Sequence, residues 1–345
     1  MSPHSWPEIL TGLVRSEGLE VEAATWALNE IFNGRASDVQ VAALLTALRA
    51  KGETEDEIVG LADAMLSNAL PISLDREAVD IVGTGGDRAN TVNVSTMAAI
   101  VAAAAGAKVV KHGSRAASSM SGTADTLEAL GVNVMAQPAS QQRILDEVGI
   151  VFLFAQMYHP AMKNVGGVRK ALGIQTTFNF LGPLANPARP LAMALGVAND
   201  DVAPVIARVL AGRGSRGLVF RGFDGLDELT TTSSSDVWLV SDGRVHRTSV
   251  DPQRLGMKPA APADLQGGDP AHNAQVVLDL VAGKRDAVRD ITVLNASAAL
   301  LAYRGVSHVV PLEDQLADLL DEVGEAIDSG AAAATLDRWV ELTNR

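Results

Sequence analysis

Residues 79–96 join a glycine-rich turn to the beginning of a predicted helix. A β-branched run at 79–82 leads into Gly83-Thr-Gly-Gly-Asp87, and Asn93-Val-Ser-Thr96 then opens an alanine-rich stretch. Glycine lets the backbone turn sharply near an anion, and a helix N-terminus presents unpaired N–H groups and the positive end of its dipole. The glycine run alone would also fit an ordinary tight turn, but the combination predicts a phosphate-binding site.

Positive charge and hydroxyl groups follow the second predicted strand. Lys111-His-Gly-Ser-Arg115 comes directly after that strand, and Ser118 and Ser119 lie in a glycine-containing turn a few residues on. Lys111 and Arg115 can neutralise phosphate, and the two serine hydroxyls can donate to the same anion. His112 is a candidate acid or base, but we assign it to lining the site. Together these residues predict a densely phosphorylated ligand.

A pair of adjacent carboxylates follows another apolar strand. Asp224-Gly-Leu-Asp-Glu228 comes shortly after Leu218-Val-Phe220, which places the acidic loop at the same sheet edge as the glycine turn. Adjacent carboxylates on a loop are usually only solvated. Magnesium, however, takes oxygen ligands and is often held by one or two carboxylates plus substrate phosphates. Asp227 and Glu228 are therefore candidate Mg²⁺ ligands, and we expect Asp224 to be structural.

The composition excludes several classes of protein. The 345 residues contain no cysteine, which excludes disulfides, thiolate metal sites and cysteine nucleophiles. A net charge of −13 without a basic run argues against nucleic acid as a partner, and 4% aromatic residues leave few stacking platforms. The most apolar helical stretch, 97–107, is far shorter than the roughly 20 residues of a membrane span. No secretory signal is visible, so we expect a cytoplasmic protein with no membrane partner.

The pattern of apolar residues predicts an α/β fold with a mostly parallel central sheet flanked by helices, and a smaller all-helical domain. Residues 5–70 predict four amphipathic helices, with Ser37 and Thr54 as N-caps of the third and fourth. Strands are predicted at residues 79–82, 108–110, 132–134, 151–154, 192–197, 217–220, 236–240 and 244–248. Further helices are predicted at 95–106, 123–130, 139–148, 200–212, 272–283, 286–302 and 311–329.

We expect two domains. Residues 1–72 form the helical domain, and the glycine- and proline-bracketed segment 163–188 is a hinge that crosses back to it. Residues 73–162 and 189–345 form the α/β domain that binds the phosphorylated ligand.

Six motifs, spread in order from about residue 78 to 230, resemble those of anthranilate phosphoribosyltransferase. They are GTGGD (83–87), NVST (93–96), KHGSR (111–115), SSMSGTAD (118–125), RKALGIQT with FNFLGPLANP (169–187), and GLDE (225–228). The resemblance implies transfer of the phosphoribosyl group of phosphoribosyl pyrophosphate to the amine of anthranilate, in tryptophan biosynthesis. It also implies Mg²⁺ as cofactor and a homodimer formed through the helical domain.

The resemblance also implies roles for individual residues. Contacts to phosphoribosyl pyrophosphate would come from Gly83, Gly86, Asp87, Thr91, Asn93, Val94, Ser95, Thr96, Lys111, Ser119 and Thr123. The anthranilate site would be lined by Gly83, His112, Ser114, His159, Arg169, Gly182 and Pro183. Among these, Arg169, which we place at the start of a helix, would face the carboxylate. The magnesium ligands would be Ser95, Asp227 and Glu228. No acid, base or nucleophile is implied, because an aromatic amine is already neutral at pH 7.

The chain departs from the family pattern at three positions. Ser114 stands where the family usually has asparagine, Gln175 where it commonly has arginine, and Arg221 where it commonly has histidine. The serine, close to the aromatic substrate, motivates one alternative, the same transfer to a modified aromatic amine. A second is a pyrimidine nucleoside phosphorylase-like enzyme, which would not need the Asp227–Glu228 pair. A third, a non-catalytic nucleic-acid-binding paralogue, is disfavoured by the acidic charge and the intact metal ligands.

Overall fold

The computed structural model describes residues 4–116 and 120–345. The chain divides into two compact units, one comprising Met1–Pro71 and Ala155–Pro187, the other Ile72–Phe154 and Ala188–Arg345. This division differs from the expected one at residues 155–162, which group with the helical unit. The reason is local bonding, since the carbonyl oxygen of Tyr158 accepts from the Leu70 amide at 2.8 Å and Nε2 of His159 bonds to the Ala185 carbonyl oxygen at 2.9 Å.

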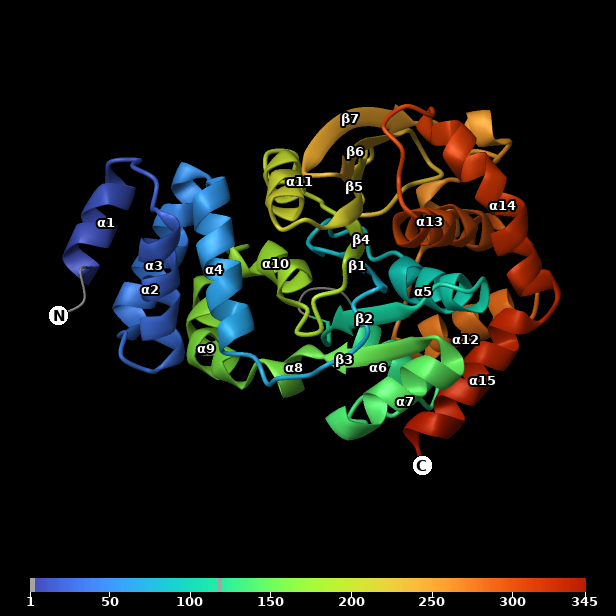
Figure 1. Ribbon diagram of the computed structural model, residues 1–345, viewed down its shortest axis with the longest axis horizontal. Helices are drawn as coiled ribbons and strands as arrows, with labels where there is room; N and C mark the ends of the chain where they lie inside the picture. Colours follow the sequence, from blue (N-terminus) through green and yellow to red (C-terminus); the bar gives the residue numbers. More distant parts are fainter. Residues whose placement is uncertain (1–3, 117–119) are drawn as a thin grey trace. The chain divides into compact units, whose positions relative to one another are not determined.

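The first unit is helical, as expected (Figure 1). Its helices are α1 (Trp6–Val14), α2 (Val21–Phe32), α3 (Asp38–Lys51), α4 (Glu55–Ser67), α8 (Ala155–Tyr158), α9 (Lys163–Leu172) and α10 (Phe178–Leu181), with short 3-10 turns η1 (Pro160–Met162) and η2 (Gly182–Ala185). Ser37 and Thr54 both form capping boxes, which confirms the predicted beginnings of α3 and α4. The carboxylate of Glu57 in the second box is fully buried and also accepts from the Leu19 amide at 2.9 Å.

The second unit contains a seven-stranded sheet with the order β3-β2-β1-β4-β5-β6-β7. The strands are β1 (Val79–Gly83), β2 (Val109–Gly113), β3 (Ile150–Phe154), β4 (Ala192–Gly196), β5 (Arg216–Gly222), β6 (Ser235–Ser241) and β7 (Arg244–Val250). Pairing is parallel from β3 to β5, and β6 and β7 join in the antiparallel sense. The expected mostly parallel sheet is thus confirmed.

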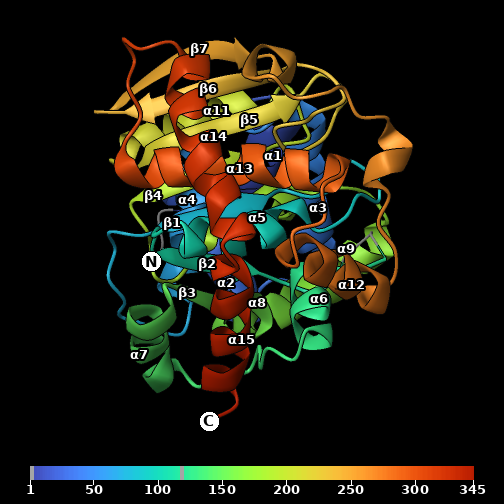
Figure 2. The same cartoon turned by 90° about the vertical axis from the view of Figure 1, so that its right-hand side faces the viewer.

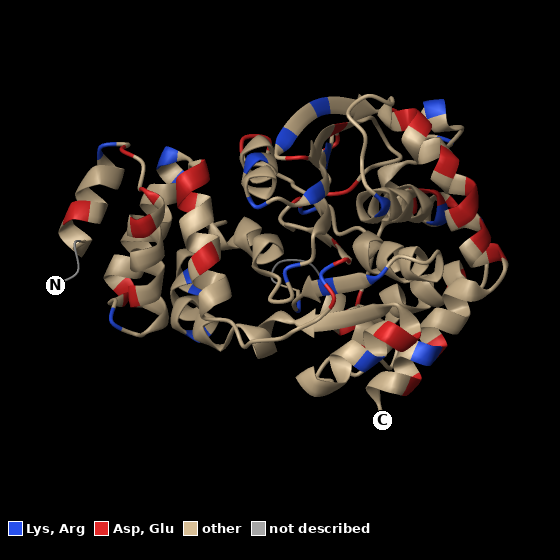
Figure 3. Ribbon diagram, in the orientation of Figure 1, with Lys and Arg blue, Asp and Glu red and all other residues tan. Residues whose placement is uncertain are grey.

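Helices cover the sheet on both faces. They are α5 (Val94–Ala104), α6 (Thr123–Ala129), α7 (Pro138–Val148), α11 (Ala203–Gly212), α12 (Pro270–Val281), α13 (Ala287–Arg304), α14 (Leu312–Asp328) and α15 (Ala331–Thr343). Helices α5 and α13 pack on each other and on the sheet, and α14 and α15 lie outside them (Figure 2). Acidic residues recur along α14 (Figure 3), in keeping with the negative net charge. Among the described residues, no helix has both the length and the apolar character needed to cross a bilayer.

One predicted strand is wrong. Residues 132–134 form no strand, because the Val132 amide bonds back to the Leu127 carbonyl oxygen at 2.9 Å and closes the C-terminus of α6. Val132 and Val134 are buried all the same. Their apolar character therefore reflects packing in a turn rather than a place in the sheet.

The carboxyl ends of the parallel strands meet at one edge, where the loops carrying the candidate site begin. Gly83 at the end of β1 pairs with Gly196 at the end of β4, and Gly196 pairs in turn with Phe220 of β5. Both glycines lack side chains for a specific reason. A Cβ on Gly83 would overlap Oδ2 of Asp227, and one on Gly196 would overlap the Asp227 carbonyl oxygen. The loop after β5 is therefore packed directly onto the glycine backbone of its neighbours.

We expect Gly196→Ala to lower the free energy of unfolding by about 1–3 kcal/mol, the usual cost of overpacking a core. The added methyl group meets backbone rather than a flexible side chain, so the Asp227 loop must shift. Urea denaturation measures the change. Gly212→Ala in α11 is the matched control, because its Cβ would meet no atom within 4 Å. Equal stability of the two variants would contradict the packing described above.

Candidate functional site

The turn after β1 has an unusual backbone. Gly85, Gly86, Arg88 and Asn90 all have positive φ, at 70°, 90°, 61° and 52°. Such turned segments can bring successive N–H groups to face one concave space, which suits an anion. The far end of the turn is held by residues 265–267, where the Val92 amide donates to the Leu265 carbonyl oxygen at 2.9 Å and Thr91 bridges to Gln266. The predicted turn is thus present and anchored at both ends.

The beginning of α5 differs from expectation in how its polar groups are used. Asn93 stands at the N-cap position, but its side chain makes no cap hydrogen bond. Instead its Oδ1 accepts from the Thr126 hydroxyl at 2.5 Å and from Nδ2 of Asn273 at 2.8 Å. Its Nδ2 donates to the Ser121 carbonyl oxygen at 3.3 Å. Asn93 therefore joins the start of α5 to α6 and α12.

Two first-turn amides of α5 are already engaged within the protein, so the expectation of unpaired N–H groups is wrong for these two. The Val94 amide donates to Val92 at 2.7 Å, and the Thr96 amide donates to Asn93 at 3.0 Å. The backbone of Ser95 favours the charged form of Glu228 and so acts to lower the pKa of that carboxyl. The positive end of the helix therefore faces a protein carboxylate, an arrangement that stabilises negative charge.

Lys111 is buried beneath this helix start. Its side chain is 1% exposed, and Nζ donates to the Ile81 carbonyl oxygen at 2.5 Å and to the Ser95 hydroxyl at 3.2 Å. Burial lowers the pKa of Lys111, while the negative charges of Asp80 and Glu228 act to raise it. Lys111 thus supplies positive charge beside the Ser95 hydroxyl and acts electrostatically on Glu228.

The other residues of the second motif are divided between the site and the scaffold. Arg115 pairs with Asp125 at 2.9 Å and Glu128 at 2.5 Å and lies over the Phe154 ring, so it is held by α6 rather than directed at an anion. Ser114 is exposed and donates to the Arg115 carbonyl oxygen at 3.0 Å. The His112 ring is buried, and Thr123 is the first residue of α6. Ser118 and Ser119 lie outside the described residues.

Asp227 and Glu228 form the acidic part of the site, and each is only 8% exposed. The Gly85 amide donates to Oδ2 of Asp227 at 2.6 Å. Burial, together with the charge of Asp87 and its side-chain hydrogen bond, raises the pKa of Asp227 to about 7. Burial also raises the pKa of Glu228, as does the charge of Asp227, whereas Lys111 opposes the rise. Like charges are therefore crowded here, with a buried lysine as the nearby cation.

This donor set fits a magnesium ion that shares its ligands with a substrate. Among the residues the structure describes, no group of three or more His, Cys, Asp and Glu is placed to hold a metal alone. Two crowded carboxylates with the Ser95 hydroxyl close by would gain from a divalent cation, which keeps further positions for phosphate oxygens. The geometry of the acidic pair suits this incomplete type of site.

The helical unit carries the remaining predicted residues. Arg169 lies in the last turn of α9, not at a helix start as expected, and its guanidinium stacks over the Phe178 ring at 5.5 Å from the centroid. Burial lowers the pKa of Arg169, and no described carboxylate forms an ion pair with it. Phe178 begins α10, where the Thr177 hydroxyl donates to the buried carboxylate of Glu53 at 2.6 Å.

His159 and the Gly182–Pro183 turn belong to the same part of the helical unit. Nε2 of His159 bonds to the carbonyl oxygen of Ala185, the last residue of η2, and Pro183 is buried in that turn. Burial lowers the pKa of His159, which opposes protonation of the ring. His159 is thus a neutral hydrogen-bonding residue here, in keeping with a lining role rather than acid–base work.

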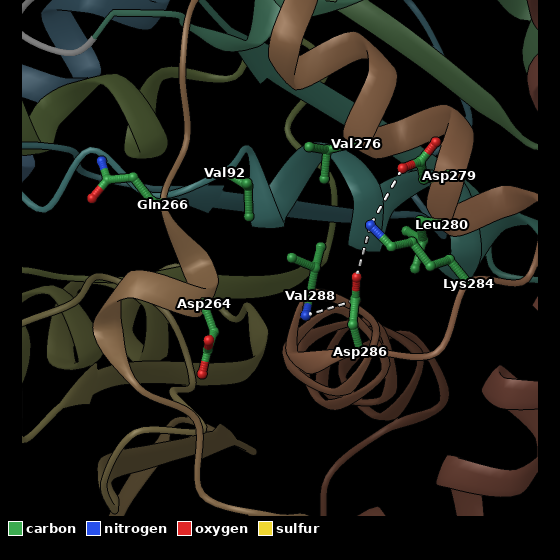
Figure 4. Close-up of a pocket in the computed structure, with 9 residues that line it drawn as sticks. All are labelled: Val92, Asp264, Gln266, Val276, Asp279, Leu280, Lys284, Asp286 and Val288. Atoms are coloured by element: carbon green, nitrogen blue, oxygen red, sulfur yellow. Dashed lines mark hydrogen bonds and ion pairs between the residues drawn. The ribbon is translucent and has the colours of Figure 1, made fainter.

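A cavity of about 160 Å³ lies beside the turn but is separate from the predicted residues. Its walls come from the loop before α12, from α12 and from the beginning of α13, and its lining residues are Val92, Asp264, Gln266, Val276, Asp279, Leu280, Lys284, Asp286 and Val288 (Figure 4). Lys284 pairs there with Asp279 at 3.4 Å and with Asp286 at 3.3 Å. The lysine that lines this cavity is thus already paired with two carboxylates of the protein.

Two buried asparagines support the site and were missed by the sequence analysis. Asn273 of α12 bonds to Asn93, and Asn295 of α13 bonds twice to the backbone of Leu229. Asn295 interrupts an apolar helical stretch between Leu294 and Ala296, whereas Asn273 stands between His272 and Ala274-Gln275 and gives no such signal. A polar residue in the middle of an apolar stretch was the available signal for Asn295, because a buried amide needs partners.

Comparison with known proteins gives a consistent result. Residues 75–333 match the family model described as glycosyl transferase family, a/b domain, and residues 7–69 match glycosyl transferase family, helical bundle domain. A protein of Arthrobacter sp. (strain FB24) named anthranilate phosphoribosyltransferase is 52% identical over 340 residues, which cover 99% of this chain and 96% of that protein. One of Nocardioides sp. (strain ATCC BAA-499 / JS614) with the same name is 52% identical over 99% of both chains.

Solved structures agree with these relatives. The crystal structure of anthranilate phosphoribosyltransferase from Thermus thermophilus has a TM-score of 0.90 at 38% identity, covering 98% of this chain and 99% of that one. The enzyme from Saccharomyces cerevisiae, in complex with PRPP and Mg, has a TM-score of 0.88 at 27% identity, covering 99% of both chains.

The crowded carboxylates predict that the stability of the metal-free protein depends on pH. Asp227 keeps its proton up to about pH 7 in the folded protein but loses it near 3.8 when unfolded. The folded state then binds more protons between these values, so the free energy of unfolding should fall as the pH rises through this window. Asp227→Asn should reduce this fall to the part that Glu228 contributes, and it should be more stable than wild type at pH 8 by up to about 4 kcal/mol, at about 1.4 kcal/mol per pKa unit.

Urea denaturation in EDTA at pH 5 and pH 8 measures this difference. Asp318→Asn, at an exposed position of α14, is the matched control and should follow the wild type at both pH values. If Asp227→Asn shows the same pH dependence as wild type, the crowding of charge is refuted.

Proposed function

The chain belongs to the anthranilate phosphoribosyltransferase family, and we propose that it catalyses the reaction for which that family is named. It transfers the phosphoribosyl group of phosphoribosyl pyrophosphate to the amine of anthranilate, giving N-(5-phosphoribosyl)anthranilate and pyrophosphate in tryptophan biosynthesis. The observation that carries the proposal is the buried Asp227–Glu228 pair packed on the glycine turn at the carboxyl edge of the sheet. That pair is what a diphosphate-binding magnesium site needs and what a phosphorylase does not.

The donor side of the reaction needs neutralisation of the leaving diphosphate. Carbon 1 of the ribose becomes electron-deficient as the diphosphate departs, so groups that stabilise the developing charge accelerate the step. A bound Mg²⁺ would supply Lewis-acid charge neutralisation there. In the proposal Asp227, Glu228 and the Ser95 hydroxyl hold that ion. Lys111, buried beneath the start of α5, adds positive charge next to the Ser95 hydroxyl.

The proposed donor contacts are the predicted set. We assign binding of phosphoribosyl pyrophosphate to residues of the turn, the start of α5 and the segments after β2, namely Gly83, Gly86, Asp87, Thr91, Asn93, Val94, Ser95, Thr96, Lys111, Ser119 and Thr123. The side chain of Asn93 is hydrogen-bonded to residues of α6 and α12. Asn93 therefore contributes to donor binding by fixing the position of the turn. Arg115 is not among the donor contacts because α6 holds it.

The acceptor side needs a cation for the anthranilate carboxylate and no strong base. An aromatic amine is neutral at pH 7, and its attack requires alignment rather than deprotonation in advance. Arg169, fixed by its stacking on Phe178 and without a described ion-pair partner, offers a planar bidentate donor. We assign the remaining acceptor contacts to Gly83, His112, Ser114, His159, Gly182 and Pro183.

The proposal extends to the protein's assembly and location. We propose a cytoplasmic homodimer formed through the helical unit. Val14 of α1 and Val39 of α3 support this assembly, being 79% and 78% exposed in the single chain. Contiguous exposed apolar patches mark surfaces that pair, and α1 and α3, which carry these two valines, pack on each other.

The reaction is tested by following the fluorescence of anthranilate in the presence of phosphoribosyl pyrophosphate and Mg²⁺. We expect loss of fluorescence that stops when EDTA is added. If fluorescence persists while calorimetry shows binding of phosphoribosyl pyrophosphate, the acceptor assignment fails, and modified aromatic amines, motivated by Ser114, become the candidates. If neither is observed, the proposed function is refuted.

Replacement of Arg169 tests the acceptor assignment separately. Arg169→Ala should raise the KM for anthranilate about 10- to 100-fold, because a hydrogen bond to a charged group contributes about 1.5–3 kcal/mol. The KM for phosphoribosyl pyrophosphate should change less than about twofold by the same argument. Steady-state kinetics with each substrate varied measures both values. Lys170→Ala, at the exposed neighbouring position, is the control, and equal effects of Arg169→Ala on both substrates would contradict the assignment.

A further inference from the structure

The Asp227–Glu228 dipeptide lies between two anchored residues of its loop. On the N-terminal side, Leu226 is fixed because its amide donates to Oδ1 of Asp224 at 3.1 Å and its carbonyl oxygen accepts from Gly222 at 2.9 Å. Asp224 also accepts from the Thr230 hydroxyl at 2.7 Å, which confirms its structural role. On the C-terminal side the anchored residue is Leu229, which is held by a side chain from another element.

Asn295 of α13 provides that second anchor. Its Oδ1 accepts from the Leu229 amide at 3.0 Å, and its Nδ2 donates to the Leu229 carbonyl oxygen at 2.7 Å. The second Nδ2 hydrogen goes to the Ile291 carbonyl oxygen at 2.9 Å within the same helix. Because Leu229 offers one donor and one acceptor, the pair of bonds fixes the orientation of the amide. Both residues have no exposed surface.

Helix α13 also packs along α5, whose first turn carries Ser95. The Thr292 hydroxyl lies 3.9 Å from the sulfur of Met97, close to that turn. One rigid helix pair therefore sets the position of both the Ser95 hydroxyl and the acidic loop. Crowded carboxylates repel one another, so a loop without its second anchor would relax outward.

We propose that Asn295 is a positioning residue for the magnesium site. By holding Leu229, it keeps the Asp227 and Glu228 carboxylates close to the Ser95 hydroxyl, where a magnesium–diphosphate complex can be bound. Asn295 itself does not touch the substrate. The inference rests on the proposed function, because it assumes that the acidic pair binds magnesium with the diphosphate of the donor.

Calorimetric titration with phosphoribosyl pyrophosphate in the presence of Mg²⁺, without anthranilate, tests this proposal. Asn295→Ala and Asn295→Leu should each weaken binding about 10- to 100-fold, the usual effect of removing a group that orients metal ligands. Gln141→Ala in α7 is the matched control, because it loses a buried side-chain amide bond to the Ala136 carbonyl oxygen at 3.1 Å, away from both the acidic loop and α5. Its affinity should stay within about twofold of wild type, and so should the KM for anthranilate of every variant.

The outcomes separate this proposal from the proposed function. If the wild type binds the donor in a magnesium-dependent way and the Asn295 variants bind it equally well, the positioning role alone is overturned. A wild type without magnesium dependence would overturn both. Should the variants fail to fold, hydrogen exchange in the wild type decides, since the Leu229 amide must exchange as slowly as the amides of α13 if Asn295 holds it. Fast exchange at Leu229 would overturn the proposal.

Discussion

The site depends on keeping two buried carboxylates close together, with the charge of buried Lys111 acting on one of them, Glu228. Isolated, Asp227 and Glu228 would repel each other and favour water. The fold opposes this repulsion through several interactions. The Gly85 amide donates to Asp227, and the Ser95 backbone and the charge of Lys111 favour the charged form of Glu228. The glycine backbone of β1 and β4 leaves the space that the loop occupies. Much of the carboxyl edge of the sheet is thus arranged around one electrostatic constraint.

The helical unit solves a different problem, which is to present an arginine in a fixed direction. Arg169 gains its orientation from the Phe178 ring, and Phe178 gains its own from α10. The first turn of α10 is held by the Thr177 hydroxyl on Glu53, whose second oxygen pairs with Arg49 at 2.7 Å. A guanidinium held this way loses less side-chain entropy on binding a carboxylate than a freely moving one.

Features that depend on a short stretch of sequence were predicted well. The strands, the glycine turn, the caps at Ser37 and Thr54 and the acidic pair all follow from local patterns, and the α/β class follows from their alternation. Partners chosen across the fold could not be predicted in this way. Arg115 is held by α6, two first-turn amides of α5 bond to neighbouring carbonyl oxygens, and Asn295 reaches Leu229 from a helix distant in sequence. The strand predicted at residues 132–134 was wrong for a related reason, because residues buried in a turn are as apolar as residues buried in a strand.

The two facing glycines at the ends of β1 and β4 have a consequence for motion in the enzyme. Gly83 and Gly196 lie directly opposite each other, and the Asp227 backbone fills the slot that their missing side chains leave. A segment packed into the sheet edge in this manner cannot move outward without losing its contacts with the central strands. Induced fit on substrate binding must then be supplied by other elements, while the acidic loop acts as the fixed reference frame against which they move.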